Sequence, residues 1–213
     1  MTRGVFITLE GGEGGGKSTQ ARLLAEALRQ RGVDVVTTRE PGGSPGAEDL
    51  RKLLVTGQAD RWDPLTEILL FLAARRDHWL RTIQPALERG QWVISDRFHD
   101  STVAYQGYGF RFDLVLIEAL RAIVLGNVQP DLTLVLDVPV ESGLKRSMAR
   151  KSDAVRHETM DLGFHERMRQ GYLDIAKAEP QRCLVVDASR PAEAVHGEIL
   201  AAVTGRFLQG RTA

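Results

Sequence analysis

The sequence has a single cysteine, no excess of charge of either sign and no long apolar run, and each absence excludes a class of protein. With Cys183 alone among 213 residues, the chain has no disulfide framework. The 28 basic and 28 acidic residues cancel, so no overall field draws the protein to nucleic acids or membrane surfaces. No apolar stretch approaches the ~20 residues of a membrane span, and no basic-then-apolar leader precedes the first predicted strand. We expect a cytoplasmic protein that binds neither nucleic acid nor a membrane.

The length suits one α/β domain with a full core, so we expect a single domain spanning residues 1–213. The one cysteine lies in the apolar run Arg182–Val186, which predicts a buried structural thiol. The five histidines show no metal-ligand spacing and are interpreted as packing or surface residues.

Short apolar runs alternate with longer helical patterns along the chain. The predicted strands are Val5–Leu9, Val33–Thr37, Trp92–Ser95, Leu132–Asp137 and Leu184–Val186. The predicted helices are Lys17–Gln30, Ala47–Leu54, Pro64–Arg89, Phe112–Leu125, Val140–Arg150, Asp161–Ala178 and Ala192–Leu208. This alternation predicts an α/β three-layer sandwich, with a five-stranded parallel sheet covered by helices on both faces.

The first predicted strand runs directly into Gly11-x-x-x-x-Gly16-Lys17-Ser18, and a helical pattern follows. This is the P-loop pattern in its required context. The glycines let backbone N–H groups turn toward phosphate oxygens, Lys17 adds a mobile charge, and Ser18 is predicted to hold Mg²⁺. An ordinary glycine-rich turn is the alternative, which the strand, the Lys-Ser pair and the helix together disfavour. The residues predicted to bind a nucleoside triphosphate are Gly11, Gly12, Glu13, Gly14, Gly15, Gly16, Lys17, Ser18 and Thr19.

Charged residues also follow three further predicted strands: Arg39 and Glu40 after the second, Asp96 and Arg97 after the third, and Asp137 at the end of the fourth. The carboxyl ends of parallel strands lie at one edge of a sheet, which is where ligands bind. Asp96 is predicted to complete the Mg²⁺ shell, because a hard cation prefers oxygen ligands, and Arg97 to bridge the phosphates that exchange a phosphoryl group. An Asp–Arg pair that caps a strand is the alternative.

Two segments carry groups suited to a nucleobase. Phe71 and Arg75 are four residues apart on one face of a predicted helix, so the ring can stack on a base while the guanidinium binds another part of the ligand. Packing of Phe71 into the core is the alternative. Residues 100–109 combine hydroxyl, amide and aromatic groups that can hydrogen-bond a pyrimidine and close over a sugar. A polar loop with glycine turns is the alternative there, and the composition alone does not decide.

Residues 144–158 concentrate positive charge: Lys145, Arg146, Arg150, Lys151 and Arg156. A solvated basic helix face is the common meaning of such a run. After a P-loop we favour a lid insertion that closes on the triphosphate, excludes water and neutralises charge on the transferring phosphoryl group.

Five segments of the chain carry a family resemblance: EGGEGGGKST, TREPGG, LLFLAARRDH, DRFHDSTVAYQGYG and FHERMRQGYLDIA. Together they closely resemble the thymidylate kinases, in the bacterial form whose extra arginines sit in the lid. The resemblance covers nearly the whole chain, and TREPGG followed by DR-x-x-DST-x-AYQG is far more specific than the P-loop. It implies a P-loop NTPase fold, a homodimer, and transfer of the γ-phosphoryl group of ATP to dTMP with Mg²⁺, giving dTDP and ADP for dTTP synthesis.

The resemblance also implies roles for single residues. Glu13 matches the acidic position that meets the deoxyribose 3′-hydroxyl, Phe71 the ring stacked on thymine, and Arg75 the arginine that reaches the base. Thr102 and Gln106 match the thymine pocket. The implied substrate-binding set is Glu13, Arg39, Glu40, Arg51, Phe71, Arg75, Arg97, Ser101, Thr102, Tyr105 and Gln106.

Within that set, Tyr105 matches a position beside the sugar, where a ring can crowd a 2′-hydroxyl. Arg39, Glu40, Arg51 and Arg97 match positions around the monophosphate and the metal. The implied catalytic charges are those of Lys17, Arg97, Arg146, Arg150 and Arg156, and the implied metal ligands are Ser18 and Asp96.

The chain departs from the family pattern in three places. Val155 stands where the lid often has an aspartate, so Arg156 lacks that acidic partner. Arg111 is displaced by one position and receives no role. The P-loop has Gly14 and Gly15 where an arginine can stand, so the catalytic positive charge is expected from the lid arginines.

Three other functions fit parts of the sequence. The nearest is a kinase of another nucleoside monophosphate or of a deoxynucleoside, and Phe71, Thr102 and Gln106 favour a pyrimidine. A P-loop switch that hydrolyses nucleotide slowly is the second, against which the chain has no Asn-Lys-x-Asp motif. A scaffold with a decayed P-loop is the third, and the presence of Lys17 and Ser18 disfavours it.

Overall fold

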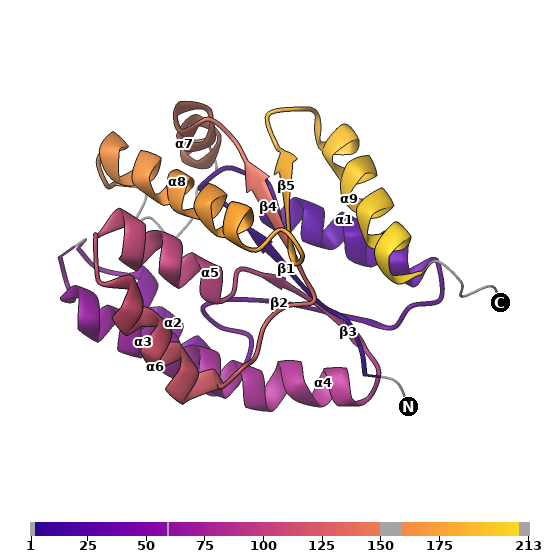
Figure 1. The fold of residues 1–213 in the computed structure, drawn as a ribbon, viewed down its shortest axis with the longest axis horizontal. Coiled ribbons are helices and arrows are strands. Elements are labelled where there is room, and N and C mark those ends of the chain that lie inside the picture. The colour runs from indigo at the N-terminus through magenta and orange to yellow at the C-terminus, as the bar shows by residue number, and fades with distance from the viewer. Residues whose placement is uncertain (1–2, 59, 150–158, 209–213) are drawn as a thin grey trace.

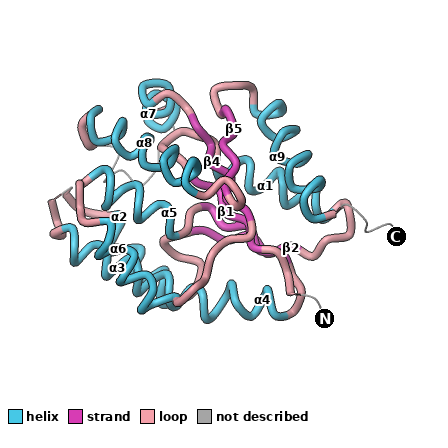
Figure 2. Tube along the Cα trace, viewed as in Figure 1, coloured by secondary structure: helices cyan, strands magenta, loops and turns pink. Residues whose placement is uncertain are grey.

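The computed structural model describes residues 3–58, 60–149 and 159–208 of the chain. Its sheet has five parallel strands, as predicted, and they lie in the order β2-β3-β1-β4-β5. Figure 2 shows this sheet enclosed between helices. The strands are β1 Phe6–Glu10, β2 Val35–Arg39, β3 Trp92–Asp96, β4 Leu132–Asp137 and β5 Cys183–Asp187.

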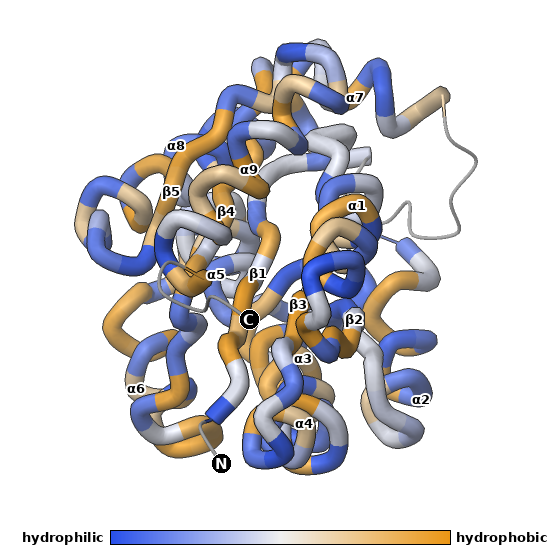
Figure 3. The backbone as a smooth tube through the Cα atoms, turned by 90° about the vertical axis from the view of Figure 1, so that its right-hand side faces the viewer, coloured by the Kyte–Doolittle hydropathy of each residue, from blue (hydrophilic) through white to orange (hydrophobic). Residues whose placement is uncertain are grey.

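The central strand β1 has buried side chains on both faces. Ile7 and Leu9 point to one face, where they pack with Leu24 and Leu28 of α1 (Lys17–Arg29) and Ile199 of α9 (Ala192–Phe207). Figure 1 shows α1 and α9 together on that side of the sheet. In the hydropathy view of Figure 3, the strands are hydrophobic over much of their length and the helices mix the two characters.

The opposite face of the sheet is covered by α8 (Leu162–Ala178) and by the helices between β2 and β4. Phe6 points to this face and packs edge-on against Phe98, with ring centroids 5.0 Å apart. Thr8 and Glu10 point the same way, because side chains alternate along a strand. This face therefore carries polar groups that a sequence pattern of near-continuous apolar residues does not reveal.

The helix predicted over Pro64–Arg89 is three consecutive helical segments: α3 Pro64–His78, a π-helical turn η1 Trp79–Ile83, and α4 Gln84–Glu88. In the wide turn the N–H of Gln84 donates to the carbonyl of Trp79, five residues earlier. The following Pro85 has no N–H, and its ring would clash with the carbonyl four residues before it in a regular helix. The π-turn accommodates that proline without ending the helical run.

Residues 99–109 form a helical segment that the sequence patterns did not predict, with α5 at His99–Thr102 and η2 at Val103–Gly109. Close packing explains its glycines. A Cβ at Gly107 would lie 2.3 Å from Leu114 Cδ2, and one at Gly109 would lie 2.5 Å from a ring carbon of Phe164. These two glycines therefore allow η2 to pack closely against the helices that contain Leu114 and Phe164. The alternative interpretation of residues 100–109 as a polar loop is wrong, because the segment is helical.

The remaining helices lie near their predicted positions: α2 Pro45–Val55, α6 Leu114–Leu125 and α7 Val140–Met148. The helix α7 begins the segment predicted as a lid, and residues 150–158 of that segment lie outside the described residues. No helix in the described part of the chain is long and apolar enough to cross a membrane.

Candidate active site

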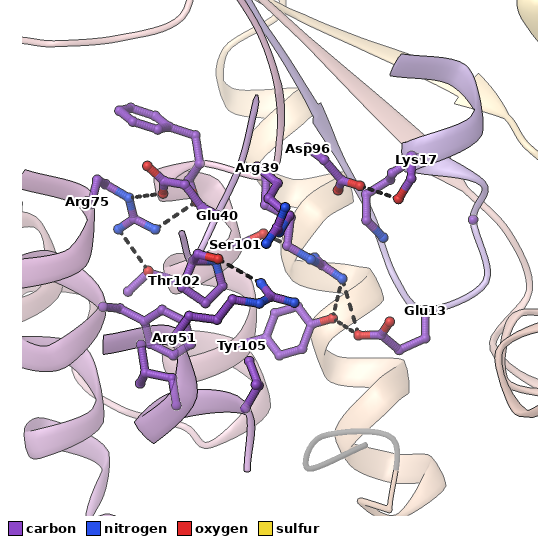
Figure 4. A pocket seen from close by; sticks show the side chains of 18 of the residues that line it. Glu13, Lys17, Arg39, Glu40, Arg51, Arg75, Asp96, Ser101, Thr102 and Tyr105 are labelled. Atoms are coloured by element: carbon purple, nitrogen blue, oxygen red, sulfur yellow. Dashed lines mark hydrogen bonds and ion pairs between the residues drawn. The ribbon is translucent and has the colours of Figure 1, made fainter. Parts of the chain in front are cut away.

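A cavity of about 300 Å³ lies beyond the carboxyl ends of β1, β2 and β3. Figure 4 shows Arg75, Glu40 and Thr102 at one end and Glu13, Asp96 and Lys17 at the other. Every residue of the predicted substrate-binding set lines this cavity: Glu13, Arg39, Glu40, Arg51, Phe71, Arg75, Arg97, Ser101, Thr102, Tyr105 and Gln106. The P-loop residues from Gly14 to Ser18 line it as well, whereas Thr19 is half-buried in the first turn of α1.

Two P-loop glycines are required by the fold around them. Gly11 has φ 127°, and a Cβ there would lie 2.4 Å from the carbonyl oxygen of Leu136. Gly14 has φ 67°, and a Cβ there would lie 2.0 Å from the carbonyl oxygen of Gly143 in α7. The loop thus packs backbone to backbone against β4 and α7, and only glycine fits at both points.

Lys17 is buried beneath the loop and donates hydrogen bonds to the carbonyls of Gly11 at 2.9 Å and Gly12 at 2.7 Å. Burial, reinforced by the charge of Arg97, lowers the pKa of Lys17 to about 8. Because the ammonium group has lost contact with water, binding an anion such as a phosphate would stabilise its charged form.

Ser18 and Asp96 bring two oxygen ligands together at the start of α1 and the end of β3. The Ser18 hydroxyl donates a 2.5 Å hydrogen bond to Oδ2 of Asp96. Mg²⁺ takes few protein oxygens and keeps several waters and phosphate oxygens, so this pair fits a magnesium site. The described residues contain no group of three or more His, Cys, Asp or Glu side chains that could hold a metal alone.

Arg97 sits at the centre of the cavity wall in an uncommon backbone conformation, with φ 74°. Its guanidinium group donates to the hydroxyls of Tyr172 at 3.0 Å and Tyr105 at 2.8 Å. It also donates to Ser101 Oγ at 3.1 Å. It further donates to Glu13 Oε1 at 3.2 Å and to the carbonyl of Gly11 at 3.1 Å. These contacts fix the charge of Arg97 beside the P-loop.

Glu13 and Tyr105 form a second element of the same wall, because the Tyr105 hydroxyl donates a short hydrogen bond to Oε1 of Glu13. Burial, opposed by the charge of Arg97 and aided by that of Glu13, raises the pKa of Tyr105 well above its ordinary value. The phenol is therefore neutral and donates.

Arg75 is held almost completely by the protein. Its Nε donates to Glu40 Oε2 at 2.6 Å, and further N–H groups donate to Thr102 Oγ1 at 3.0 Å, the carbonyl of Phe98 at 3.0 Å and His99 Nδ1 at 3.5 Å. A guanidinium has five N–H groups, and four of those of Arg75 have partners among the described residues.

Glu40 lines the cavity, and both of its carboxylate oxygens have protein partners. Its second carboxylate oxygen binds His78 Nδ1 at 2.9 Å, and Thr38 Oγ1 lies 2.7 Å from the other nitrogen of that histidine. Burial would raise the pKa of Glu40, but Arg75 and His78 hold it below its ordinary value. A buried carboxylate needs such partners, so Glu40 positions Arg75.

Gln106 and Phe71 complete the end of the cavity near Arg75. The Gln106 amide donates to Oε1 of Glu67 at 2.6 Å, which fixes its orientation. Phe71 is half-buried and lines the cavity, while its neighbour Leu72 is in the core. The alternative of Phe71 as a core residue is therefore wrong.

Two further arginines extend into the middle of the cavity (Figure 4). Arg39 is half-exposed and contacts both oxygens of Glu48 at 3.1 Å. Arg51 donates to the carbonyl of Pro41 at 2.7 Å, and Glu40 and Pro41 are joined by a cis peptide bond. Together with Arg97 they concentrate positive charge where a phosphate would lie.

The predicted lid arginines have a different outcome. Arg146 donates to the carbonyls of Ala188 at 2.8 Å and Ser189 at 3.1 Å, in the loop between β5 and α9, so the structure directs it to that loop. Arg150 and Arg156 lie outside the described residues.

At the end of β4, Asp137 forms a bidentate ion pair with Arg169 of α8, with N–O distances of 2.7 and 2.9 Å.

Comparison with known proteins decides the family. The model of the family described as thymidylate kinase matches residues 9–199. The chain belongs to the thymidylate kinase family. It is 57% identical over 207 residues to a thymidylate kinase of Caulobacter vibrioides, covering 97% of this chain and 99% of that protein. It is 54% identical over 202 residues to one of Dinoroseobacter shibae, covering 94% and 97%.

A crystal structure of thymidylate kinase from Ehrlichia chaffeensis is similar in fold, with a TM-score of 0.77 at 41% identity. The match covers 94% of this chain and 99% of that chain. Family membership agrees with the P-loop NTPase fold and with the enzyme class predicted from the sequence.

The structure adds functional residues that the sequence did not indicate. Tyr172 of α8 is fully buried and binds Arg97, but its place in a helical apolar pattern is typical of a core residue. Glu67 and His78 orient Gln106 and Glu40, and they lie on the same helix as Phe71 and Arg75. Their position on the buried face of that helix is the one signal that could have identified them.

Proposed function

We propose that this protein transfers the γ-phosphoryl group of ATP to dTMP, giving dTDP and ADP. The observation that carries the proposal is that one cavity is lined at the same time by the P-loop and by Phe71, Arg75 and Gln106. A P-loop alone serves hydrolysis as well as transfer, whereas a cavity that extends beyond it to an aromatic ring and polar side chains provides for an acceptor. Membership in the thymidylate kinase family supports dTMP as that acceptor.

The P-loop end of the cavity receives the triphosphate. Its backbone N–H groups and the start of α1 favour phosphate oxygens, and Lys17 exchanges its two carbonyl contacts for phosphate. Ser18 and Asp96 would hold Mg²⁺, which when bound neutralises charge between the terminal phosphates. ATP and Mg²⁺ are thus the proposed donor and cofactor.

The opposite end receives the acceptor nucleotide. Phe71 offers a ring face for stacking on thymine, and the fifth N–H group of Arg75 is available for a carbonyl oxygen of the base. Arg39 and Arg51 lie where the monophosphate would bind. Glu13 extends from the P-loop end and accepts a hydrogen bond from Tyr105, and the deoxyribose is proposed to lie beside this pair.

The transfer step needs alignment and charge stabilisation more than it needs a base, because the attacking phosphate oxygen is already anionic. Arg97 lies between the triphosphate end and the monophosphate end, so its guanidinium is placed to stabilise the oxygens of the transferring group. The rigid contacts to Tyr105 and Tyr172 keep that charge in position without reorganisation. Closure by the basic segment 144–158 is part of the same proposal.

A homodimer is supported by the surface of α6. Nearly every residue of this helix is apolar, yet Val115 is 78% exposed and Ile123 81% exposed. Leu69 on the neighbouring α3 is also exposed. Exposed apolar side chains on two neighbouring helices favour an interaction site, and a second copy of the chain is the proposed partner. A cytoplasmic location also stays a prediction.

The experiment that tests the function is ADP release from Mg-ATP, compared for dTMP, dUMP, UMP, CMP, dCMP, AMP, GMP and thymidine. We expect fast turnover with dTMP, with dUMP slower, because discrimination by one methyl group is limited to roughly 1–3 kcal/mol. A faster rate with another monophosphate would reassign the base pocket. A slow rate that no acceptor stimulates would indicate a P-loop switch.

A further inference from the structure

Glu10 is a carboxylate at the end of β1 that the proposed reaction does not use. It has no exposed surface, and by the alternation of side chains along β1 it points, like Thr8, to the face of the sheet that α8 covers. Its Oε1 accepts a 2.7 Å hydrogen bond from the backbone N–H of Phe98, and its Oε2 accepts a 2.6 Å hydrogen bond from the hydroxyl of Ser101. Both donors follow Arg97 in the chain: Phe98 is the next residue, and Ser101 comes four residues after Arg97.

The backbone of Arg97 is held from the same stretch of β1 and the P-loop. The N–H of Arg97 donates to the carbonyl of Leu9 at 2.9 Å, and its guanidinium donates to the carbonyl of Gly11 at 3.1 Å. Glu10 lies between these two acceptors and binds the next N–H along the chain. Leu9 and Glu10 thus hold the backbone N–H groups before and after the Cα of Arg97, which has a left-handed conformation, and Gly11 holds its guanidinium group.

Each hydroxyl group has one proton, so only one assignment of donors and acceptors satisfies the hydrogen bonds between Arg97, Tyr172, Ser101 and Glu10. Ser101 has one proton, which it donates to Glu10, so it accepts from Tyr172. Tyr172 in turn accepts from Arg97 and donates to Ser101. The donated protons therefore all point from Arg97 toward Glu10, whose carboxylate is the final acceptor of this series of hydrogen bonds.

From this geometry we infer that Glu10 is a positioning residue for phosphoryl transfer, which fixes both the backbone and the guanidinium of Arg97. The inference rests on the proposed role of Arg97 in the reaction. Glu10 contacts neither nucleotide position directly; it acts through Phe98, Ser101 and Tyr172.

Glutamine cannot replace this carboxylate, although it has the same shape. If the glutamine amide nitrogen faces Ser101, the serine must accept a hydrogen bond from it and donate its own proton elsewhere. This reverses the direction of the series of hydrogen bonds that begins at Arg97. If the amide nitrogen faces Phe98, two N–H donors face each other. The substitution Glu10→Gln therefore removes one of the two hydrogen bonds that this side chain accepts, from Phe98 or from Ser101, with little change in side-chain volume.

A matched control lies two residues earlier on the same face of β1. Thr8 is fully buried, and its hydroxyl lies 2.9 Å from the Thr133 hydroxyl. The substitution Thr8→Val removes a buried polar contact of this strand without touching Arg97.

The test is a double-mutant cycle of Glu10→Gln and Arg97→Ala, with kcat for dTMP phosphorylation measured at saturating Mg-ATP. Burial and the charge of Asp100 raise the pKa of Glu10 to about 7, against the lowering effect of Arg97, so pH 8 keeps the carboxylate ionised. We expect Glu10→Gln to lower kcat about 10- to 100-fold in the native background and less than about threefold beside Arg97→Ala. KM for ATP and the activity of Thr8→Val should stay within about threefold of native.

Equal losses in the two backgrounds, or no loss in the native one, would overturn the inference. Near-normal activity of Arg97→Ala would overturn the role of Arg97 itself, which distinguishes that failure from the first. If Glu10→Gln does not fold, Glu10→Asp replaces it, because the shorter side chain keeps the charge but draws the carboxylate away from Phe98 and Ser101. It should then lower kcat in the native background and lose its effect beside Arg97→Ala.

Discussion

Ser18 and Asp96 are joined by a 2.5 Å hydrogen bond between the serine hydroxyl and Oδ2 of the carboxylate, which links the start of α1 to the end of β3. We predict that Asp96→Asn lowers kcat by about 10²-fold, because the amide removes the charge that balances Mg²⁺. The Mg²⁺ concentration that gives half-maximal activity at fixed ATP should rise as well.

The control for this change is Asp49→Asn, since Asp49 is an exposed carboxylate whose ion pair with Lys52 lies on the surface of α2. The measurement is a titration of activity against Mg²⁺ for both variants. An Asp96→Asn protein with a native Mg²⁺ dependence would show that this pair does not hold the metal.

Phe71 is predicted to stack on the base of the acceptor. Aromatic pairs contribute about 0.5–1.5 kcal/mol beyond area burial, so Phe71→Leu should raise KM for dTMP about 2- to 10-fold. KM for ATP should not change, because Phe71 lies at the opposite end of the cavity from the P-loop. Steady-state kinetics with each substrate varied in turn measures both constants, and Ala73→Ser on the exposed side of α3 is the control. Equal increases in the two KM values would contradict a role at the base.

The pH dependence of ATP use should report Lys17. Burial and the charge of Arg97 lower the pKa of Lys17 to about 8, so the charged form predominates only below that pH in the free enzyme. We expect kcat/KM for Mg-ATP to be constant below pH 8 and to fall above it, since the neutral amine cannot attract phosphate. The value of kcat should be flat over the same range, because bound triphosphate favours the charged form. A kcat/KM that stays constant to pH 9.5 would refute the assignment.

The exposed apolar face of α6 predicts the oligomeric state. Ile123→Asp should convert the protein from about twice the chain mass to the 23.6 kDa monomer, because it places a charge in the proposed interface. Light scattering coupled to size-exclusion chromatography measures the mass. Val185→Asp, at an exposed apolar position on the edge strand β5, should leave it unchanged. A native protein that already runs as a monomer would end the dimer proposal.

The sheet could be predicted from the sequence because its strands are buried on both faces. Runs such as that of β4, Leu132–Asp137, are almost continuously apolar and end in charged residues at the ligand edge. The prediction for β2 was displaced by two residues, since this edge strand continues through Thr37, Thr38 and Arg39, which a hydrophobic pattern does not include.

The residues that line the cavity could also be predicted, because motif residues at the ends of parallel strands must meet at one edge of the sheet. The side chains that hydrogen-bond to those residues could not be predicted. Glu40 was expected in the cavity, but its pairing with Arg75 and His78, which are 35 and 38 residues away in the chain, has no local signal in the sequence. Glu10 and Tyr172 have polar roles that depend on contacts across 75 to 91 residues, and no local pattern records them.

The central claim is that the charges of this cavity carry phosphoryl transfer to dTMP. The most direct test is the kcat for dTMP phosphorylation of Arg97→Ala and Lys17→Ala, with folding of each variant confirmed by circular dichroism. Loss of a preorganised charge predicts a fall of at least ~10²-fold in both. Near-normal turnover in either well-folded variant would contradict the account.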